Sequence, residues 1–177
     1  MAREQVNIQL TNNTNAKFVF GALPGVEYHC AKFNLPGVSL GETPIANTFT
    51  TYAEPGRVTF NYLDISFLVD EDYKNWITVF DWMCNVGYSR SFNQFKSLKN
   101  RPNADGYNGE FSDAAVVFYN SNRMPNGVVA NFEQCFPASL GDLDFDMQTS
   151  APTPFLCNMR IQYQLYTIET PWRKNIK

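Results

Sequence analysis

The fold is decided by residues 63–87, which read LDISFLVDEDYKNWITVFDWMCNVG. Apolar side chains occupy every second position from Leu63 to Val69, which is the period of a strand with one buried face. After the acidic residues 70–72 the period changes, and apolar residues recur at i, i+3, i+4 and i+7, as on an amphipathic helix. The stretch therefore predicts a strand that leads directly into the only substantial helix of the chain.

The predicted helix carries two of the three tryptophans. Because large aromatic side chains bury the most apolar surface, we expect the helix to pack on a sheet and to anchor the core. The residues predicted to do so are Trp76, Phe80, Trp82 and Met83. We interpret the acidic residues 70–72 as a cap for the first helical turn, and a cation site is the alternative.

The composition predicts one sheet-rich domain with much of its surface in contact with other subunits. A chain of 177 residues is one domain by length, and 15 Phe with 9 Tyr favour β-structure. Charged residues make up only 18%, which indicates that much of the surface lies against other subunits. The net charge of −3 gives no sign of electrostatic binding to nucleic acid.

The sequence offers little material for catalysis or for metal binding. It has four cysteines without a CxxC pair and one histidine, His29, so a zinc site is not expected and the cysteines are predicted to be free thiols. Cys30 follows His29, but neighbouring residues of a strand point to opposite faces, which makes them a poor dyad. With no nucleotide-binding or hydrolase motif, we predict no enzyme, no metal and no cofactor.

No segment predicts a membrane anchor. The first ten residues lack the apolar region of a signal peptide, and no apolar run approaches the length that spans a bilayer. We therefore expect a protein that is made in a cytoplasm and remains soluble or assembles.

Residues 38–62 predict a long hairpin that cannot bury itself. An extended run over 38–52 and a return strand over 57–62 are joined at Glu54-Pro55-Gly56. The first arm buries little of its own surface, and an isolated hairpin is marginally stable. We expect a neighbour to cover it, and another copy of the chain is one candidate.

Short strands and one long loop account for the remainder. Strands are predicted over 17–22, 28–34, 111–120, 127–135, 141–146 and 155–168. Residues 88–109 predict a loop that makes contacts, and its basic residues Lys96, Lys99 and Arg101 are interpreted as a subunit contact or a solvated surface. On a strand over 141–146, Asp142, Asp144 and Asp146 would share one face; a wet surface is one reading, and a wall that repels a polyanion is the other.

The order of the motifs is more specific than any one of them. They are LPG (35–37), VSLGETP (38–44), EPGRVTF (54–60), LDISFLVDED (63–72), NWITVFDWM (75–83), DAAVVFYNSN (113–122) and FEQCFPASLGDLDFD (132–146), followed by a long last strand. Over residues 17–169 this order resembles the tail tube protein family of contractile-tailed bacteriophages. The resemblance implies a mainly β fold, a small antiparallel β-sandwich or barrel with one flanking α-helix and a long hairpin.

The resemblance also implies a function. Six copies would form a ring, rings would stack into a tube within the tail sheath, and DNA would pass through the bore to the host. The subunit would belong to the virion, assemble in the host cytoplasm and contact sheath and baseplate or neck proteins. The hairpin would pack on neighbouring subunits, and the acidic residues Asp142, Asp144 and Asp146 would line the bore. The hairpin residues assigned to subunit contacts are Leu35, Pro36, Gly37, Pro44, Phe49, Tyr52, Pro55 and Gly56.

Two other readings stay open beside the main tube subunit. The first is a baseplate tube initiator or a neck terminator of the same fold, because a flexible N-terminal arm (1–16) and a basic C-terminal tail (170–177) extend beyond the resembling domain (17–169). The second is a β-sandwich binding module of the tail, for which Tyr88, Phe92, Phe95 and Tyr107 are the aromatic residues of the predicted loop.

Overall fold

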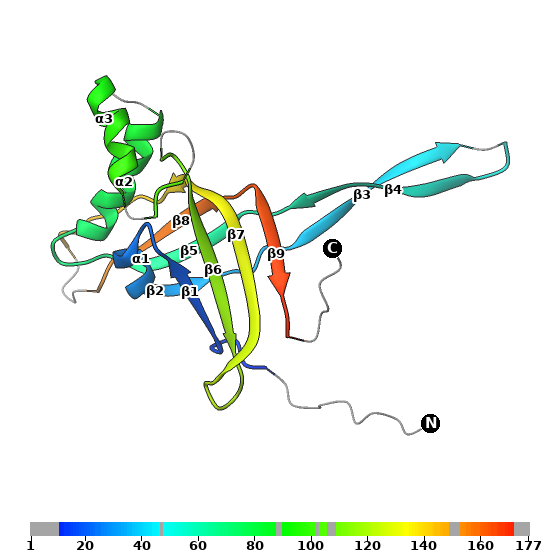
Figure 1. The fold of residues 1–177 in the computed structure, drawn as a ribbon, viewed down its shortest axis with the longest axis horizontal. Coiled ribbons are helices and arrows are strands. Elements are labelled where there is room, and N and C mark those ends of the chain that lie inside the picture. Colours follow the sequence, from blue (N-terminus) through cyan, green and yellow to red (C-terminus); the bar gives the residue numbers. More distant parts are fainter. Residues whose placement is uncertain are drawn as a thin grey trace.

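A computed structural model describes residues 11–46, 48–87, 90–101, 103–105, 109–148 and 153–171. These residues form a mainly antiparallel β-protein with one long helix (Figure 1), which confirms the predicted fold class. The strands are β1 (Ala16–Phe20), β2 (Cys30–Phe33), β3 (Val38–Ala46), β4 (Thr51–Phe60), β5 (Leu63–Leu68), β6 (Ser112–Tyr119), β7 (Pro125–Leu140), β8 (Leu156–Gln162) and β9 (Leu165–Glu169). The helices are α1 (Pro24–Tyr28), α2 (Lys74–Gly87), α3 (Phe92–Ser97) and the 3-10 helix η1 (Leu98–Asn100).

Strand β7 joins the two layers of the body because it belongs to both. Its first part pairs with β6 and β9, and its last part pairs with β8, which in turn pairs with β5. Between them the register with β6 shifts, and Gln134 adopts a positive φ of 54°. Such a bulge bends a strand and increases its twist. The bend lets one continuous strand pass from one layer to the other (Figure 1).

Two predicted strand boundaries are wrong because of this bend. The expected stop at Phe136-Pro137 does not occur, since β7 continues to Leu140. A register shift between Pro137 and Ser139 marks a bulge, where a proline without an N–H is tolerated. The single strand expected over 155–168 is two strands, β8 and β9, because the chain turns at residues 163–164 to follow β7 around the bend.

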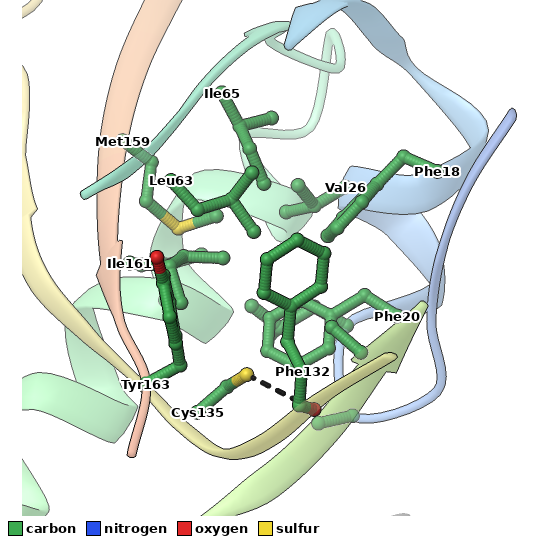
Figure 2. Packing of buried hydrophobic residues seen from close by; sticks show 14 of the residues in the cluster. Phe18, Phe20, Val26, Leu63, Ile65, Phe132, Cys135, Met159, Ile161 and Tyr163 are labelled. Atoms are coloured by element: carbon green, nitrogen blue, oxygen red, sulfur yellow. Dashed lines mark hydrogen bonds between the residues drawn. The ribbon is translucent and has the colours of Figure 1, made fainter. Parts of the chain in front are cut away.

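The core lies between the two layers and is almost entirely apolar (Figure 2). Alternating residues of β5 are fully buried, as predicted for the opening stretch. Phe132 of β7 packs edge-to-face on Tyr163, and its ring stacks on Tyr166. Core residues labelled in Figure 2 include seven from β1, α1, β5 and β8, which are Phe18, Phe20, Val26, Leu63, Ile65, Met159 and Ile161.

Helix α2 closes the sandwich at one end, but the face that it buries differs from the predicted face. Trp82 is 1% exposed, its indole N–H donates to the carbonyl of Glu110 at 3.2 Å, and the guanidinium of Arg101 lies 3.6 Å from its ring. Trp76 and Met83 are only partly buried against the core. Phe80, predicted in the core, is instead 46% exposed, because the face that meets the core runs through Asn75, Val79 and Trp82.

Three short helical segments replace irregular or extended structure in the prediction. Between the strands expected over 17–22 and 28–34 lies α1, where Pro24 occupies the first turn, a position at which its missing N–H costs nothing. As a result the strand expected over 28–34 begins only at Cys30. The loop expected over 88–109 contains α3 and η1, and Ser91 with Gln94 forms the capping box that starts α3.

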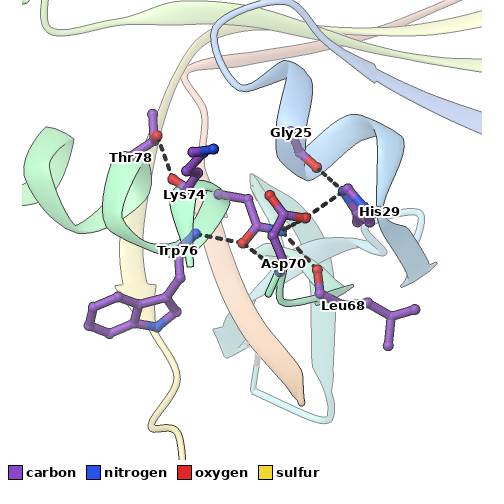
Figure 3. Close-up of polar contacts among 8 residues, drawn as sticks. Gly25, His29, Leu68, Asp70, Lys74, Trp76 and Thr78 are labelled. Carbon is purple, nitrogen blue, oxygen red and sulfur yellow. Dashed lines mark hydrogen bonds and ion pairs between the residues drawn. The ribbon is translucent and has the colours of Figure 1, made fainter. Parts of the chain in front are cut away.

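The entry into α2 is held by Asn75 rather than by an acidic cap. Asn75 is 3% exposed; its amide N–H donates to Leu68 O at 2.8 Å, and its amide oxygen accepts from the backbone N–H groups of Trp76 and Asp70. The Asp70 carboxylate binds His29 Nδ1 at 3.1 Å, which also donates to Gly25 O at 2.9 Å (Figure 3). This cluster ties α1, the end of β5 and the start of α2 together, so His29 serves structure here.

Replacement of Asn75 by alanine is expected to destabilise the protein. The change leaves the carbonyl of Leu68 and the N–H of Asp70 without their part-buried partner, which costs about 1–3 kcal/mol of the free energy of unfolding. Urea denaturation measures the loss. The exposed Asn93 of α3 is the matched control, and an equal effect of Asn93→Ala would contradict this role for Asn75.

Stability is also expected to fall at alkaline pH. Burial raises the pKa of the Cys135 thiol and of the Tyr163 hydroxyl to about 12 each, from ordinary values of 9.0 and 10.0. As the pH rises, the unfolded chain releases these protons first, so the free energy of unfolding falls between about pH 9 and 12, by up to about 1.4 kcal/mol per pH unit for each group. Urea titrations at stepped pH test this, and a Tyr163→Phe variant should show a shallower decline.

Candidate subunit interface

The hairpin β3–β4 projects from the body as a separate two-stranded sheet (Figure 1). Every described residue of both strands is exposed. The 19 residues of the two strands therefore bury almost none of their side-chain surface in a single copy. A two-stranded hairpin of this kind is at best marginally stable in water on its own.

The turn of the hairpin lies earlier in the chain than predicted. Thr51 pairs with Ala46, so the turn falls between these two residues, and Pro55 with Gly56 lies inside β4. The register shifts between Leu40 and Glu42, where Gly56 and Arg57 lie opposite Gly41. A Cβ on Gly56 would come within 3.1 Å of the carbonyl oxygen of Gly41. The glycine and the proline are thus accommodated by a bulge instead of ending the strand.

This bulge-bearing hairpin offers apolar pairs on both of its faces. Near the body Val38 pairs with Phe60, and near the tip Ile45 pairs with Tyr52. Along β3 these positions differ by an odd number of residues, so the two pairs point to opposite faces. An element with exposed apolar side chains on two faces can lie between two surfaces at once.

The base of the hairpin is fixed to the body, which sets its direction. The Phe60 ring lies 5.9 Å from that of Tyr166 and 6.4 Å from that of Tyr163. The hydroxyl of Tyr163 donates to the carbonyl of Asn61 at 2.7 Å, and Asn61 N–H donates to Gly37 O at 3.0 Å. These contacts fix the direction in which the hairpin leaves the body.

The structure distributes the predicted interface residues along the whole hairpin. Phe49 at the tip is 95% exposed, and Leu35 and Tyr52 are exposed as well. Pro36 is buried at the base, where it belongs to the body. The remaining predicted residues, Gly37, Pro44, Pro55 and Gly56, are exposed. The predicted set lacks five further exposed apolar residues, which are Val38, Leu40, Ile45, Val58 and Phe60.

The acidic residues Asp142, Asp144 and Asp146 are exposed but do not lie on a strand. Residues 141–146 have irregular structure after the end of β7, so the strand prediction is wrong. The segment runs beside α2, where Leu143 packs partly on the core and the Phe145 ring lies 4.8 Å from that of Phe155. The three aspartates therefore do not share one strand face, which was the basis for predicting that they line a bore.

The aromatic residues of the binding-module alternative do not form one platform. Tyr88 and Tyr107 lie outside the described residues. Phe95 packs partly against the core, whereas Phe92 is exposed with the ammonium of Lys96 4.8 Å from its ring. Arg101 is engaged with Trp82 and the carbonyl of Gly109, so the basic residues of this region do not act as one patch.

The described residues were also compared with the predictions on metal binding, on cysteine pairing and on membrane-spanning helices. Within residues 11–46, 48–87, 90–101, 103–105, 109–148 and 153–171, no three His, Cys, Asp or Glu side chains are grouped to hold a metal ion. All four cysteines are free thiols, as predicted. No helix in this part of the chain is long and apolar enough to cross a bilayer.

Comparison with known proteins assigns the chain to a family. A family model described as "Phage tail tube protein" matches residues 3–169. The chain therefore belongs to the phage tail tube protein family. The match includes most of the predicted N-terminal arm and ends before the basic tail. The search of curated proteins found no match.

Solved structures of contractile systems share the fold at low sequence identity. The anti-feeding prophage cap, a tube terminating cap, has a TM-score of 0.61 and 13% identity over 94% of this chain and 96% of its own. A chain of the PVC sheath-tube complex, an extracellular contractile injection system, has a TM-score of 0.57 and 13% identity over 93% and 94%. A chain of the anti-feeding prophage baseplate has a TM-score of 0.53 and 10% identity over 98% and 100%.

Amide exchange is expected to separate the hairpin from the body. In a lone copy the amides of β3 and β4 should exchange at least about tenfold faster than those of β5 and β8, because the hairpin opens without disturbing the core. Hydrogen–deuterium exchange with mass spectrometry at low protein concentration measures both. Equal protection of hairpin and body in a lone copy would contradict a hairpin that depends on a partner.

Proposed function

We propose that the chain is the repeating subunit of a phage tail tube, in which six copies form a ring and rings stack around a bore that conducts DNA. Membership of the tail tube family supports a structural role in a contractile tail. The single observation that carries the self-assembly is the projecting hairpin, whose residues are exposed throughout both strands.

On this proposal the hairpin holds neighbouring copies together and determines how they are arranged. Its exposed apolar pairs on two faces would be covered by neighbouring copies, which removes apolar surface from water at about 25 cal/mol per Å². The outer edges of β3 and β4 carry backbone groups that pair with no further described strand, and strand addition on a neighbour would satisfy them. Contacts between unlike surfaces of identical copies close into rings or continue as stacks.

The body supplies the rigidity that a conduit requires. Its two layers share β7, and their inner faces form one apolar core. A tube built from such bodies would resist bending while a sheath contracts around it and drives it through the host envelope. On this proposal the partners are further copies of the chain, the sheath, and baseplate or neck proteins, all within the virion after assembly in the host cytoplasm. No step of this mechanism requires enzymatic chemistry.

A tube initiator or terminator is the second candidate within the family. The solved structures that share the fold include a tube terminating cap and a baseplate chain, and their likeness to this chain matches that of the tube. An initiator or terminator would form a single ring, whereas a repeating subunit would grow without a fixed end.

Electron microscopy of the purified full chain distinguishes these functions. Negative-stain images, with light scattering for mass, should show rings with a central hole that stack into tubes. Isolated rings at every concentration would favour the initiator or terminator. Monomers at every concentration, also in the presence of purified baseplates, would contradict the proposal.

A charge at the tip of the hairpin is expected to prevent assembly without unfolding the body. In the double variant Ile45→Glu and Tyr52→Glu, two carboxylates replace a cross-strand apolar pair, and docking would bury both without partners, at a cost of several kcal/mol. Light scattering should report monomers, and urea denaturation an unchanged body. The conservative double variant Ile45→Val and Tyr52→Phe is the control and should assemble. Rings formed by the charged variant would exclude this face from the interface.

A further inference from the structure

A second unpartnered apolar surface lies at the end of the body away from the hairpin. It is a groove of about 900 Å³ between α2 and residues 140–145. Its apolar lining comes from Trp76, Ile77, Phe80 and Met83 on one side and from Leu143 and Phe145 on the other. The rings of Trp76 and Phe80 stack at 5.4 Å, which gives the groove a flat aromatic wall.

The rim of this groove is acidic. Asp72 and Asp142 line it, and Asp81, Asp144 and Asp146 are exposed on the same two segments. Lys74, which is paired with Asp72, is the one cation in residues 70–87 and 140–146. An apolar floor beneath a negative rim fits a peptide that combines large apolar side chains with cations.

The last residues of this chain have that chemistry. Residues 170–177 read TPWRKNIK, with the apolar Trp172 and Ile176 and three cations at Arg173, Lys174 and Lys177, and without an acidic residue. The segment follows the part of the chain that the family model matches. Trp and Arg are the side chains most often found at the energetic centre of protein interfaces.

The segment cannot reach the groove of its own copy. It leaves the body at Pro171, which lies against Gly127 near the start of β7, whereas the groove adjoins Leu140 at the end of β7. Even if β7 turned through a right angle at Gln134, these points would lie about 29 Å apart, and six residues extend at most about 20 Å. Figure 1 shows β9 leaving the body at a point well away from α2.

We infer that residues 171–177 of one copy dock in the groove between α2 and residues 140–145 of a second copy. This inference rests on the proposed self-assembly and names one of its contacts. Trp172 fills the apolar groove, and the cations of the segment meet Asp72 and Asp142 at the rim. The contact joins two unlike surfaces, so each copy carries one free groove and one free segment, and the arrangement can repeat without limit.

Peptide binding tests the docking without requiring rings. The probe is a fluorescently labelled synthetic peptide of residues 170–177, and the receptor is the full chain with Trp172→Ala and Lys174→Glu, so that its own segment does not compete. Fluorescence anisotropy should show saturable binding. Asp142→Lys in the receptor should weaken it at least about tenfold, equivalent to about 1.4 kcal/mol. Glu133→Lys, a matched change on β7 outside the groove, should leave it unchanged.

A charge exchange makes the test specific. A peptide with Lys174→Glu should bind the wild-type groove poorly and should regain affinity for the Asp142→Lys receptor. Absence of saturable binding, or binding that is insensitive to both Asp142→Lys and Phe80→Ser, would overturn the inference. Because the assay measures peptide binding and not ring formation, that result would leave the ring proposal standing, whereas monomers in electron microscopy together with peptide binding would overturn the ring proposal alone.

Discussion

The bend of β7 is the constraint on which the rest of the structure depends. One strand of 16 residues contributes to both layers of the body, so the layers cannot slide past each other without breaking its pairing. The bend is built from two residues of β7 opposite Asp113, whose carboxylate accepts the N–H of Gln134 at 3.0 Å. This hydrogen bond offsets part of the cost of a positive φ at a non-glycine residue, roughly 1–3 kcal/mol. The enclosed core and the path of β8 into β9 follow from this corner.

The sequence predicts elements well where one period governs them, and poorly where the chain bends. The alternation in β5 and the change of period into α2 are local signals, and both appear in the structure. The turn between β8 and β9 is imposed by pairing with β7, and no residue near Tyr163 marks it. Helix α2 meets the core on one side and the groove on the other, so its aromatic residues lie on two faces, and an apolar stripe cannot tell which face is inside.

The exposure of the hairpin could be predicted because its strands lack a buried apolar face. Its arms carry β-prone residues without enough apolar alternation to form a core, and the structure leaves them uncovered. The position of its turn was not predictable in the same way, because Glu54-Pro55-Gly56 has the composition of a turn. A bulge opposite Gly41 accommodates these residues inside β4, and bulges depend on the partner strand, which a local pattern does not contain.

A single copy of this chain leaves two apolar surfaces uncovered, the hairpin and the groove beside α2. The hairpin and the groove beside α2 lie at opposite ends of the molecule (Figure 1), and each exposes aromatic side chains that a monomer would normally bury or avoid. A closed dimer with twofold symmetry could cover either surface by pairing it with itself. Covering both with unlike surfaces of further copies gives every subunit the same environment, and only a ring or a continuing stack achieves this. If both surfaces are covered by further copies, as proposed, their separation favours a ring or stack over a closed dimer.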